Sequence, residues 1–167
     1  MHVPFFSVVI CTYQRGHLLD RAIASLLAQD ETDWEAVIVD DGSTDNTQQV
    51  VQKYIDSGAP IRYFRHEHCG VARSRNAGVD QSRGLFVTFL DSDDEYRADH
   101  LSSRHAMLLQ DQSIMLLHGG VEVFGDPYVR DRHDPSMLIH LDECVIGGTF
   151  VIRRDLFETV GRFSEID

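Results

Sequence analysis

The sequence predicts an α/β domain of three layers, in which helices cover both faces of a mostly parallel central sheet. Between residues 5 and 91, short and nearly continuous apolar runs alternate with amphipathic segments of helical period. Such runs are typical of parallel strands that are buried on both faces. The alternation requires right-handed crossovers, which place the helices on the two faces of the sheet. The 167 residues fit a single domain.

Four apolar runs are the predicted strands of the parallel part. They are FFSVVIC (5–11), WEAVIVD (34–40), IRYFR (61–65) and LFVTFLD (85–91). Each is bounded by polar residues or by glycine and proline, which end strands.

Four helices are predicted, over 17–29, from about Asp45, over 71–82 and over 100–110. The first has an apolar stripe at helical spacing, and the second begins with Asp45 and Gln48 at the spacing of a capping box. The stripe consists of Leu18, Leu19, Ala22, Ile23, Leu26 and Leu27.

The pattern changes after the fourth strand. Residues 113–125 predict one or two strands broken at a glycine pair, and 144–153 predict a last strand that two glycines interrupt. Between them, the polar segment 126–137 contains two prolines and predicts a mobile loop.

Composition excludes several classes of function. The net charge of −12 and the pI near 5.0 disfavour binding to nucleic acid. No apolar run approaches the roughly 20 residues that span a bilayer, and the N-terminus lacks the pattern of a signal peptide. The three cysteines are odd in number and widely spaced, which suits a reducing compartment and argues against a disulfide framework or a zinc site. The composition predicts a cytoplasmic protein and leaves peripheral membrane association open.

Three polar clusters follow predicted strands. They are CTYQR (11–15), DDGSTD (40–45) and DSDDE (91–95). In open parallel sheets, ligands bind at the carboxyl ends of the strands. Because these clusters would share that edge, their coincidence predicts a binding site there.

The acids Asp91, Asp93 and Asp94 have two interpretations. A solvated turn that opens a helix is the ordinary one, because acids favour a helix N-terminus. However, a buried strand leads directly into Asp91, which favours a divalent cation held by carboxylate and diphosphate oxygens. Glu95 stands where an EF-hand needs its third ligand and where a D-x-D-x-T phosphatase needs threonine, so both of those sites are excluded.

The second cluster also has two interpretations. Asp40 and Asp41 could form a turn, with Asp45 capping the next helix. Two adjacent acids exceed what a turn needs, and one carboxylate could accept hydrogen bonds from a nucleobase or ribose. In the segment 68–78, Arg73 is interpreted as a solvated helix residue, whereas Arg75 could bind diphosphate oxygens bidentately.

Together these segments resemble a family-2 glycosyltransferase with the GT-A fold. The resemblance lies in SVVICTYQR (7–15), VIVDDGSTDNT (37–47), GVARSRNAG (70–78), GLFVTFLDSDD (84–94) and GGTFVIRRDLFETVGRFSE (147–165). These segments occur in the family's order and cover nearly the whole chain.

The resemblance implies transfer of a sugar, with inversion, from a nucleotide-diphosphate donor, most often a UDP-sugar, to a saccharide or lipid-linked acceptor. It implies Mn²⁺ or Mg²⁺, with Asp93 as the main metal ligand and Asp91 near the metal and the ribose. The implied nucleotide-sugar-binding residues are Cys11, Thr12, Tyr13, Arg15, Asp41, Arg75, Asp91 and Ser92.

The family's general base lies in a short acidic motif somewhat beyond the G-x-F-x-E segment, here GRFSEID. We therefore expect the base beyond Asp167, in a domain truncated at its C-terminus. The alternative places it in the final residues, with Glu165 and Asp167 as candidates. A non-catalytic nucleotide-sugar-binding domain and a sugar nucleotidyltransferase are the rival functions, and a homo-oligomer is left open.

Overall fold

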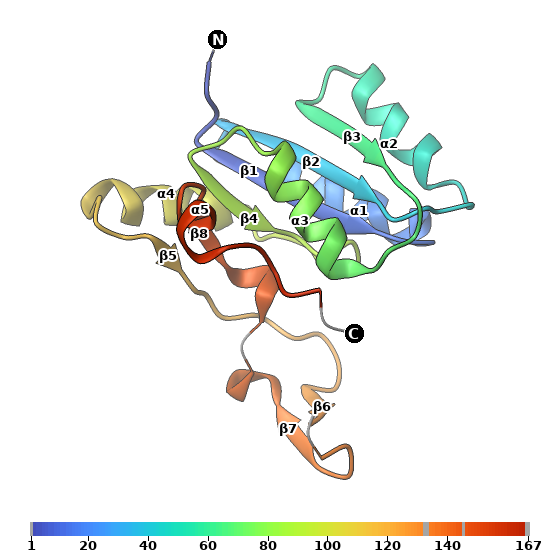
Figure 1. The fold of residues 1–167 in the computed structure, drawn as a ribbon, viewed down its shortest axis with the longest axis vertical. Coiled ribbons are helices and arrows are strands. Elements are labelled where there is room, and N and C mark those ends of the chain that lie inside the picture. Colours follow the sequence, from blue (N-terminus) through green and yellow to red (C-terminus); the bar gives the residue numbers. More distant parts are fainter. Residues whose placement is uncertain (1, 132–133, 145, 166–167) are drawn as a thin grey trace.

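In the computed structural model, which describes residues 2–131, 134–144 and 146–165, a sheet of six strands forms the centre of the molecule. The strand order is β3-β2-β1-β4-β8-β5 (Figure 1). The strands are β1 (Phe6–Thr12), β2 (Trp34–Asp40), β3 (Ile61–Arg65), β4 (Phe86–Phe89), β5 (Leu116–Leu117) and β8 (Val151–Arg153).

Strand β1 lies between two parallel neighbours. It pairs with β2 on one side and with β4 on the other, and β2 pairs in parallel with β3. Thr12 lies opposite Asp40 in this register, so β1 and β2 end at the same edge of the sheet. Strand β8 pairs antiparallel with both β4 and β5. The predicted mostly parallel sheet is confirmed.

Helices cover both faces of the sheet, as predicted (Figure 1). Val8 and Ile10 of β1 belong to the buried cluster that contains residues of α1, α2 and α4, whereas Val9 belongs to the cluster of α3 and α5. Alternate side chains of β1 therefore point into opposite layers. The helices are α1 (Gly16–Leu27), α2 (Thr47–Asp56), α3 (Val71–Gln81), α4 (His100–Gln110) and α5 (Leu156–Val160).

The start of α2 differs slightly from the prediction. The helix begins at Thr47, and Asp45 lies just before it. The Asp45 carboxylate accepts hydrogen bonds from the Thr47 backbone N–H at 3.0 Å and from the Gly16 backbone N–H at 3.0 Å. The predicted capping side chain thus also ties α2 to the start of α1.

The region after α4 is where the sequence prediction was wrong. The predicted mobile loop at 126–137 includes β6 (Tyr128–Arg130), which pairs with β7 (Leu138–His140) in an antiparallel hairpin that projects from the domain (Figure 1). The two prolines of 126–137 lie outside the paired residues, where a missing N–H costs no ladder hydrogen bond.

Two predicted strands are shorter than expected. The segment 113–125 contains only β5, and the strand expected at 144–153 is limited to β8. Before β8, Gly147–Thr149 form a 3-10 turn that lies beside β4. Residue 145 lies outside the described residues. Among the residues that are described, no helix combines the length and apolar character needed to cross a bilayer.

His100 opens α4 in an unusual environment. Its ring stacks on Tyr96 with centroids 3.7 Å apart, and its buried Nε2 has no hydrogen-bond partner in the described part of the chain. Burial, followed by the charge of Arg104, lowers the pKa of His100 to about 3. The folded protein therefore resists protonation of His100 at a pH where the unfolded chain accepts it.

We predict that His100→Phe flattens the acid side of the stability profile. Because the folded pKa lies below the unfolded value near 6.5, stability is full above that value and falls as the pH drops below it. Between pH 7 and pH 5 the unmutated protein should lose about 1–2 kcal/mol more than the variant, after allowance for the partial exposure of the ring. Urea unfolding at both pH values measures this. Exposed His17→Phe is the control, and parallel profiles for both variants would contradict the prediction.

Candidate active site

A cavity of about 500 Å³ opens at the carboxyl ends of β1, β2 and β4. It brings together all the nucleotide-sugar-binding and metal-binding residues that the sequence predicted. The lining residues are Cys11, Thr12, Tyr13, Arg15, Asp41, His68, Gly70, Val71, Ser74, Arg75, Asp91, Ser92 and Asp93.

Both acids of the D-S-D segment are paired with arginine. Arg75 Nη2 lies 3.0 Å from Asp91 Oδ1, and Arg15 Nη1 lies 2.7 Å from Asp93 Oδ2. The two carboxylates are 37% and 43% exposed, so water and ions can reach them. Cationic groups therefore already occupy the positions where the sequence predicted a divalent cation.

The pKa of Asp94 shows that the acids at 91–94 repel one another. Burial, and then the charges of Asp91 and Asp93, raise the pKa of the Asp94 carboxyl. The two arginines therefore leave a surplus of negative charge at this edge. Oxygen donors with a surplus of negative charge suit Mg²⁺ or Mn²⁺.

Two glycines allow the 3-10 turn before β8 to approach the Arg75–Asp91 pair. A Cβ added at Gly147 would lie 3.3 Å from Arg75 Nη1, and one at Gly148 would lie 3.3 Å from Asp91 Oδ2. The Arg75 guanidinium also packs over the rings of Phe89 and Phe163. Its orientation is thus set by residues from both halves of the chain.

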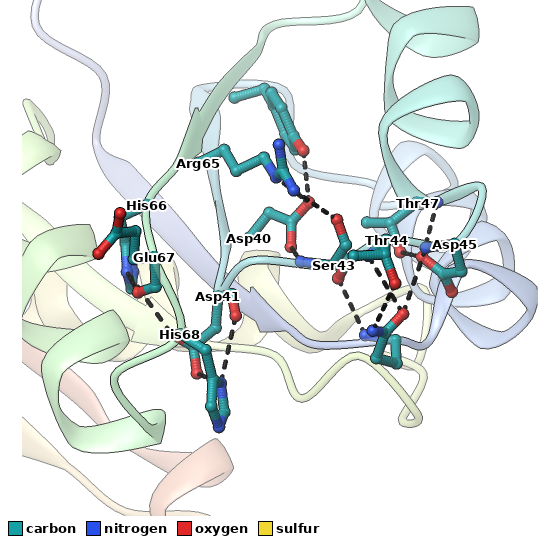
Figure 2. A network of polar contacts seen from close by, with 12 residues as sticks. Asp40, Asp41, Ser43, Thr44, Asp45, Thr47, Arg65, His66, Glu67 and His68 are labelled. Carbon is teal, nitrogen blue, oxygen red and sulfur yellow. Dashed lines mark hydrogen bonds and ion pairs between the residues drawn. The ribbon is translucent and has the colours of Figure 1, made fainter.

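The carboxylate of Asp41 is buried and holds the segment after β3. It accepts hydrogen bonds from the backbone N–H groups of Cys69 at 2.8 Å and Gly70 at 3.0 Å. His68 Nδ1 lies 2.8 Å from its Oδ2 (Figure 2). Burial acts to raise the pKa of Asp41, but these two hydrogen bonds and the charge of His68 outweigh it and lower the pKa. Asp41 is therefore an ionised group inside the site.

Asp40 has a different role. It is 1% exposed and accepts hydrogen bonds from the Ser43 backbone N–H at 2.8 Å and from the Tyr63 hydroxyl (Figure 2). Burial and this hydrogen bond raise the pKa of Tyr63, which keeps the hydroxyl protonated. Asp40 therefore joins β2 to β3 and is not among the residues that line the cavity.

Tyr13 and His68 form a stacked pair at the mouth of the cavity. Their ring centroids are 4.1 Å apart and the rings are inclined by 18°. Tyr13 precedes Gln14, whose backbone has a positive φ of 54° and whose N–H donates to Ser43 Oγ at 2.9 Å. This contact locks the loop after β1 to the loop after β2.

Two residues of the β1 end have contrasting properties. Burial raises the pKa of the Cys11 thiol to about 12, so Cys11 is a neutral apolar residue. Thr12 is 3% exposed, and among the described residues its Oγ1 has no hydrogen-bond partner. A buried hydroxyl without a partner beside a cavity is an unused hydrogen-bonding group.

Of the candidate general bases near the C-terminus, the one within the described part of the chain does not line the cavity. Glu165, a candidate base, accepts hydrogen bonds from Arg73 at 2.9 Å and Asn76 at 3.3 Å and is outside the cavity lining. Asp167, the other candidate, lies outside the described residues. Sequence reasoning did not select His68 or Gly70, although they follow the third strand and the strand-end rule applies to them equally.

The architecture and the site together define the class of protein. The solved structure of TarS from S. aureus in complex with UDP-GlcNAc aligns with 92% of this chain and 46% of its own, at 27% identity and a TM-score of 0.73. The mannosyltransferase PcManGT from Pyrobaculum calidifontis, solved with GDP-Man and Mn²⁺, aligns with 99% of this chain and 49% of its own at a TM-score of 0.76, and its 20% identity shows the fold alone. The fold is the GT-A type.

The glycosyl transferase family 2 profile matches residues 7–161, so the chain belongs to that family. A curated relative, the GalNAc(5)-diNAcBac-PP-undecaprenol beta-1,3-glucosyltransferase of Campylobacter jejuni, is 41% identical over 60% of this chain and 33% of its own length. The Escherichia coli UDP-Glc:alpha-D-GlcNAc-diphosphoundecaprenol beta-1,3-glucosyltransferase WfgD is 32% identical over 72% of this chain and 47% of its own. The chain thus spans between a third and a half of these two relatives.

We predict that the two neighbouring acids differ in their structural importance. Asp40→Asn should cost about 2–3 kcal/mol of unfolding free energy, because it removes the charge from two buried hydrogen bonds. Asp41→Asn should cost about 1–2 kcal/mol, because the segment it holds lies at the cavity edge and can be solvated. Urea unfolding of the matched pair tests this. A larger loss from Asp41→Asn would show that the segment 66–70 is part of the cooperative core.

Proposed function

We propose that this chain is the donor-binding part of a glycosyltransferase that transfers a hexose from a UDP-sugar to a hydroxyl of a saccharide or lipid-linked acceptor. The observation that carries the proposal is the meeting, in one cavity, of the buried ionised Asp41 with the Asp91–Arg75 and Asp93–Arg15 pairs. The relative that uses UDP-Glc and the neighbour that holds UDP-GlcNAc support the choice of donor.

The nucleobase would bind between Tyr13 and Asp41. Tyr13 offers an exposed aromatic face, and Asp41 can accept a hydrogen bond from a ring N–H. His68 now makes both contacts, because it stacks on Tyr13 and bonds Asp41 through Nδ1. We therefore infer that His68 occupies the base position and must leave it when the nucleotide binds. The unused hydroxyl of Thr12 is available to the nucleoside.

The diphosphate would bind beside Asp91 and Asp93. Mn²⁺ or Mg²⁺ would be held by Asp93 and Asp91, whose half-exposed oxygens and surplus charge fit such an ion. When bound, the metal offsets the negative charge that develops on the leaving diphosphate. Arg15 and Arg75 would exchange their carboxylate partners for phosphate oxygens, which a guanidinium can bind bidentately.

The acceptor hydroxyl needs a base, and a positioned carboxylate typically contributes about 10²–10⁴-fold to such a step. We propose that this base lies beyond Asp167, in the part of the protein that corresponds to the remaining length of the relatives. Direct attack by the acceptor hydroxyl on the face opposite the diphosphate would invert the anomeric centre. A cytoplasmic location, homo-oligomer formation and peripheral membrane association remain predictions.

Two rival functions remain to be separated. A non-catalytic nucleotide-sugar-binding domain would use the same cavity without transfer. A sugar nucleotidyltransferase would need a glycine-rich loop with arginine and lysine after the first strand, and CTYQRGHLL is not such a loop. Measuring hydrolysis or transfer of UDP-sugars by the full-length protein distinguishes an enzyme from a binder.

We predict that UDP binding depends on a divalent metal. Calorimetry should show at least tenfold weaker binding in EDTA than in Mn²⁺, and Asp93→Ala should abolish the difference while leaving the fold intact. Glu95→Gln is the matched control, because Glu95 is a neighbouring acid outside the cavity that pairs with Arg21. Equal affinity with EDTA and with Mn²⁺ in the unmutated protein would refute the metal-diphosphate site.

We predict that substitutions of His68 and Asp41, the two residues at the proposed nucleobase site, change UDP affinity in opposite directions. His68→Ala should strengthen UDP binding severalfold, because it removes a competitor from Tyr13 and Asp41. Asp41→Asn should weaken binding by about 1–3 kcal/mol, the scale of a hydrogen bond to a charged group. Calorimetry in Mn²⁺ measures both, with His17→Ala as the control for loss of an imidazole outside the cavity lining. A weaker complex with His68→Ala would mean that His68 contacts the nucleotide directly.

We predict that residues 1–167 bind the donor but do not transfer its sugar, whereas the full-length protein does both. Donor contacts in the proposal lie between Cys11 and Asp93, and the base does not. Measuring UDP-sugar affinity and transfer on both proteins tests this. Comparable transfer rates would place the base within these residues and direct mutagenesis to Glu165 and Asp167.

A further inference from the structure

Three side chains of different chemistry converge at the edge of the cavity. They are Asp41 at the end of β2, His66 after β3 and Cys69 before α3, and their ligand atoms all lie within 4.8 Å of one another. His66 Nδ1 is 3.1 Å from Cys69 Sγ and 3.5 Å from Asp41 Oδ1. The sequence argued against a zinc site from cysteine spacing alone, whereas the sheet brings this cysteine to a histidine and an acid.

Ser74 can support the histidine tautomer that a metal needs. The Ser74 hydroxyl donates to the Gly70 carbonyl at 3.0 Å, so it can only accept at its 3.3 Å contact with His66 Nε2. With the hydrogen on Nε2 in this way, Nδ1 can act as a metal ligand; the 2.8 Å contact of Nδ1 with the Glu67 carbonyl is a hydrogen bond in the alternative tautomer. A second hydrogen bond that orients the imidazole in this way is typical of metal-binding histidines.

The surroundings of His66 Nδ1 are rich in electron pairs. Besides the thiol and the carboxylate, the Glu67 carbonyl oxygen lies 2.8 Å from this nitrogen. A metal at this position would take the place of the hydrogen that Nδ1 otherwise shares with the Glu67 carbonyl or the Cys69 thiol. Asp41 is 4% exposed, and its Oδ1 is already positioned by the Cys69 backbone N–H.

The donor set selects a class of metal. Thiolate and imidazole ligands favour Zn²⁺ and similar soft or borderline ions, whereas Mg²⁺ and Mn²⁺ prefer carboxylate, carbonyl and water oxygens. Binding would displace the thiol proton of Cys69, as thiolate coordination does in general.

We propose that Asp41, His66 and Cys69 form a binding site for Zn²⁺ or a similar thiophilic ion, and that its occupation hinders donor binding. The second part rests on the proposed function, because it takes Asp41 as the residue that recognises the nucleobase. The metal draws on the same carboxylate, and it fixes the segment 66–70 that includes His68. The site is separate from the proposed Mn²⁺ ligands Asp91 and Asp93.

Cobalt spectroscopy tests the metal site without any nucleotide. Adding Co²⁺ to the reduced protein should produce thiolate-to-cobalt charge-transfer absorption, which Zn²⁺ abolishes and Mg²⁺ does not. Cys69→Ser should eliminate the charge-transfer band, and His66→Gln should weaken Co²⁺ binding at least tenfold. Cys144→Ser, which changes a half-buried thiol away from the cavity, is the control and should keep the band. Circular dichroism verifies that each variant is folded. A band that survives Cys69→Ser, or the absence of a band in the unmutated protein, would overturn the proposal.

Calorimetry of UDP in Mn²⁺, with and without one equivalent of Zn²⁺, tests the competition. Zn²⁺ should weaken UDP binding at least tenfold in the unmutated protein and not in Cys69→Ser. Unchanged UDP affinity in the zinc-loaded protein would overturn the inhibitory role. If UDP fails to bind under any condition, the proposed function fails, while the cobalt result still decides whether the metal site exists.

Discussion

The parallel pairing of β1 with both β2 and β4 is the constraint on which the rest of the structure depends. It requires a strand that is apolar on both faces, and Val8, Val9 and Ile10 meet this requirement by filling two separate buried clusters. It also brings the ends of neighbouring strands to one edge, so that Thr12 and Asp40 lie opposite each other. Polar residues placed after these strands are thereby gathered into one cavity, to which α3 adds Ser74 and Arg75.

A second constraint is electrostatic. Acids at the cavity edge are tolerated because each has a defined partner: Asp40 has Ser43 and Tyr63, Asp41 has backbone N–H groups, and the D-S-D acids have arginines. These partners differ in how readily they can exchange. Backbone donors to Asp41 are part of the fold, whereas the half-exposed arginine pairs can exchange, because such pairs contribute little to stability.

Much of the fold could be predicted, because its first half follows rules that act locally. The runs 34–40 and 61–65 have the predicted bounds as β2 and β3, since turn residues border both. The second half depends on contacts between distant residues. The hairpin of β6 and β7 was missed because its strands have three residues each and contain no buried residue, so neither has a detectable period.

The sequence predicted which residues line the candidate site, but not which of them contact each other. The nine predicted donor-binding and metal-binding residues line one cavity. Eight of them lie at or just after strand ends, which determine their position, and Arg75 lies on α3. That Arg15 contacts Asp93, or that Cys69 contacts His66, depends on loop conformations such as the positive φ of Gln14, which short-range patterns do not specify. For the same reason, the sequence did not identify His68 as part of the proposed nucleobase site. Its ring stacks on Tyr13 only when the loops after β1 and β2 are held together.

The two arginine–aspartate pairs have a consequence for the energetics of ligand entry. If Arg15 and Arg75 pass from carboxylate to phosphate oxygens while a metal takes their place, the number of close ion contacts in the cavity hardly changes. Binding would then resemble ion exchange, in which contacts are traded and few are newly created. Added salt weakens the initial and the final contacts alike, so the donor affinity of such a site depends less on ionic strength than its charge density suggests.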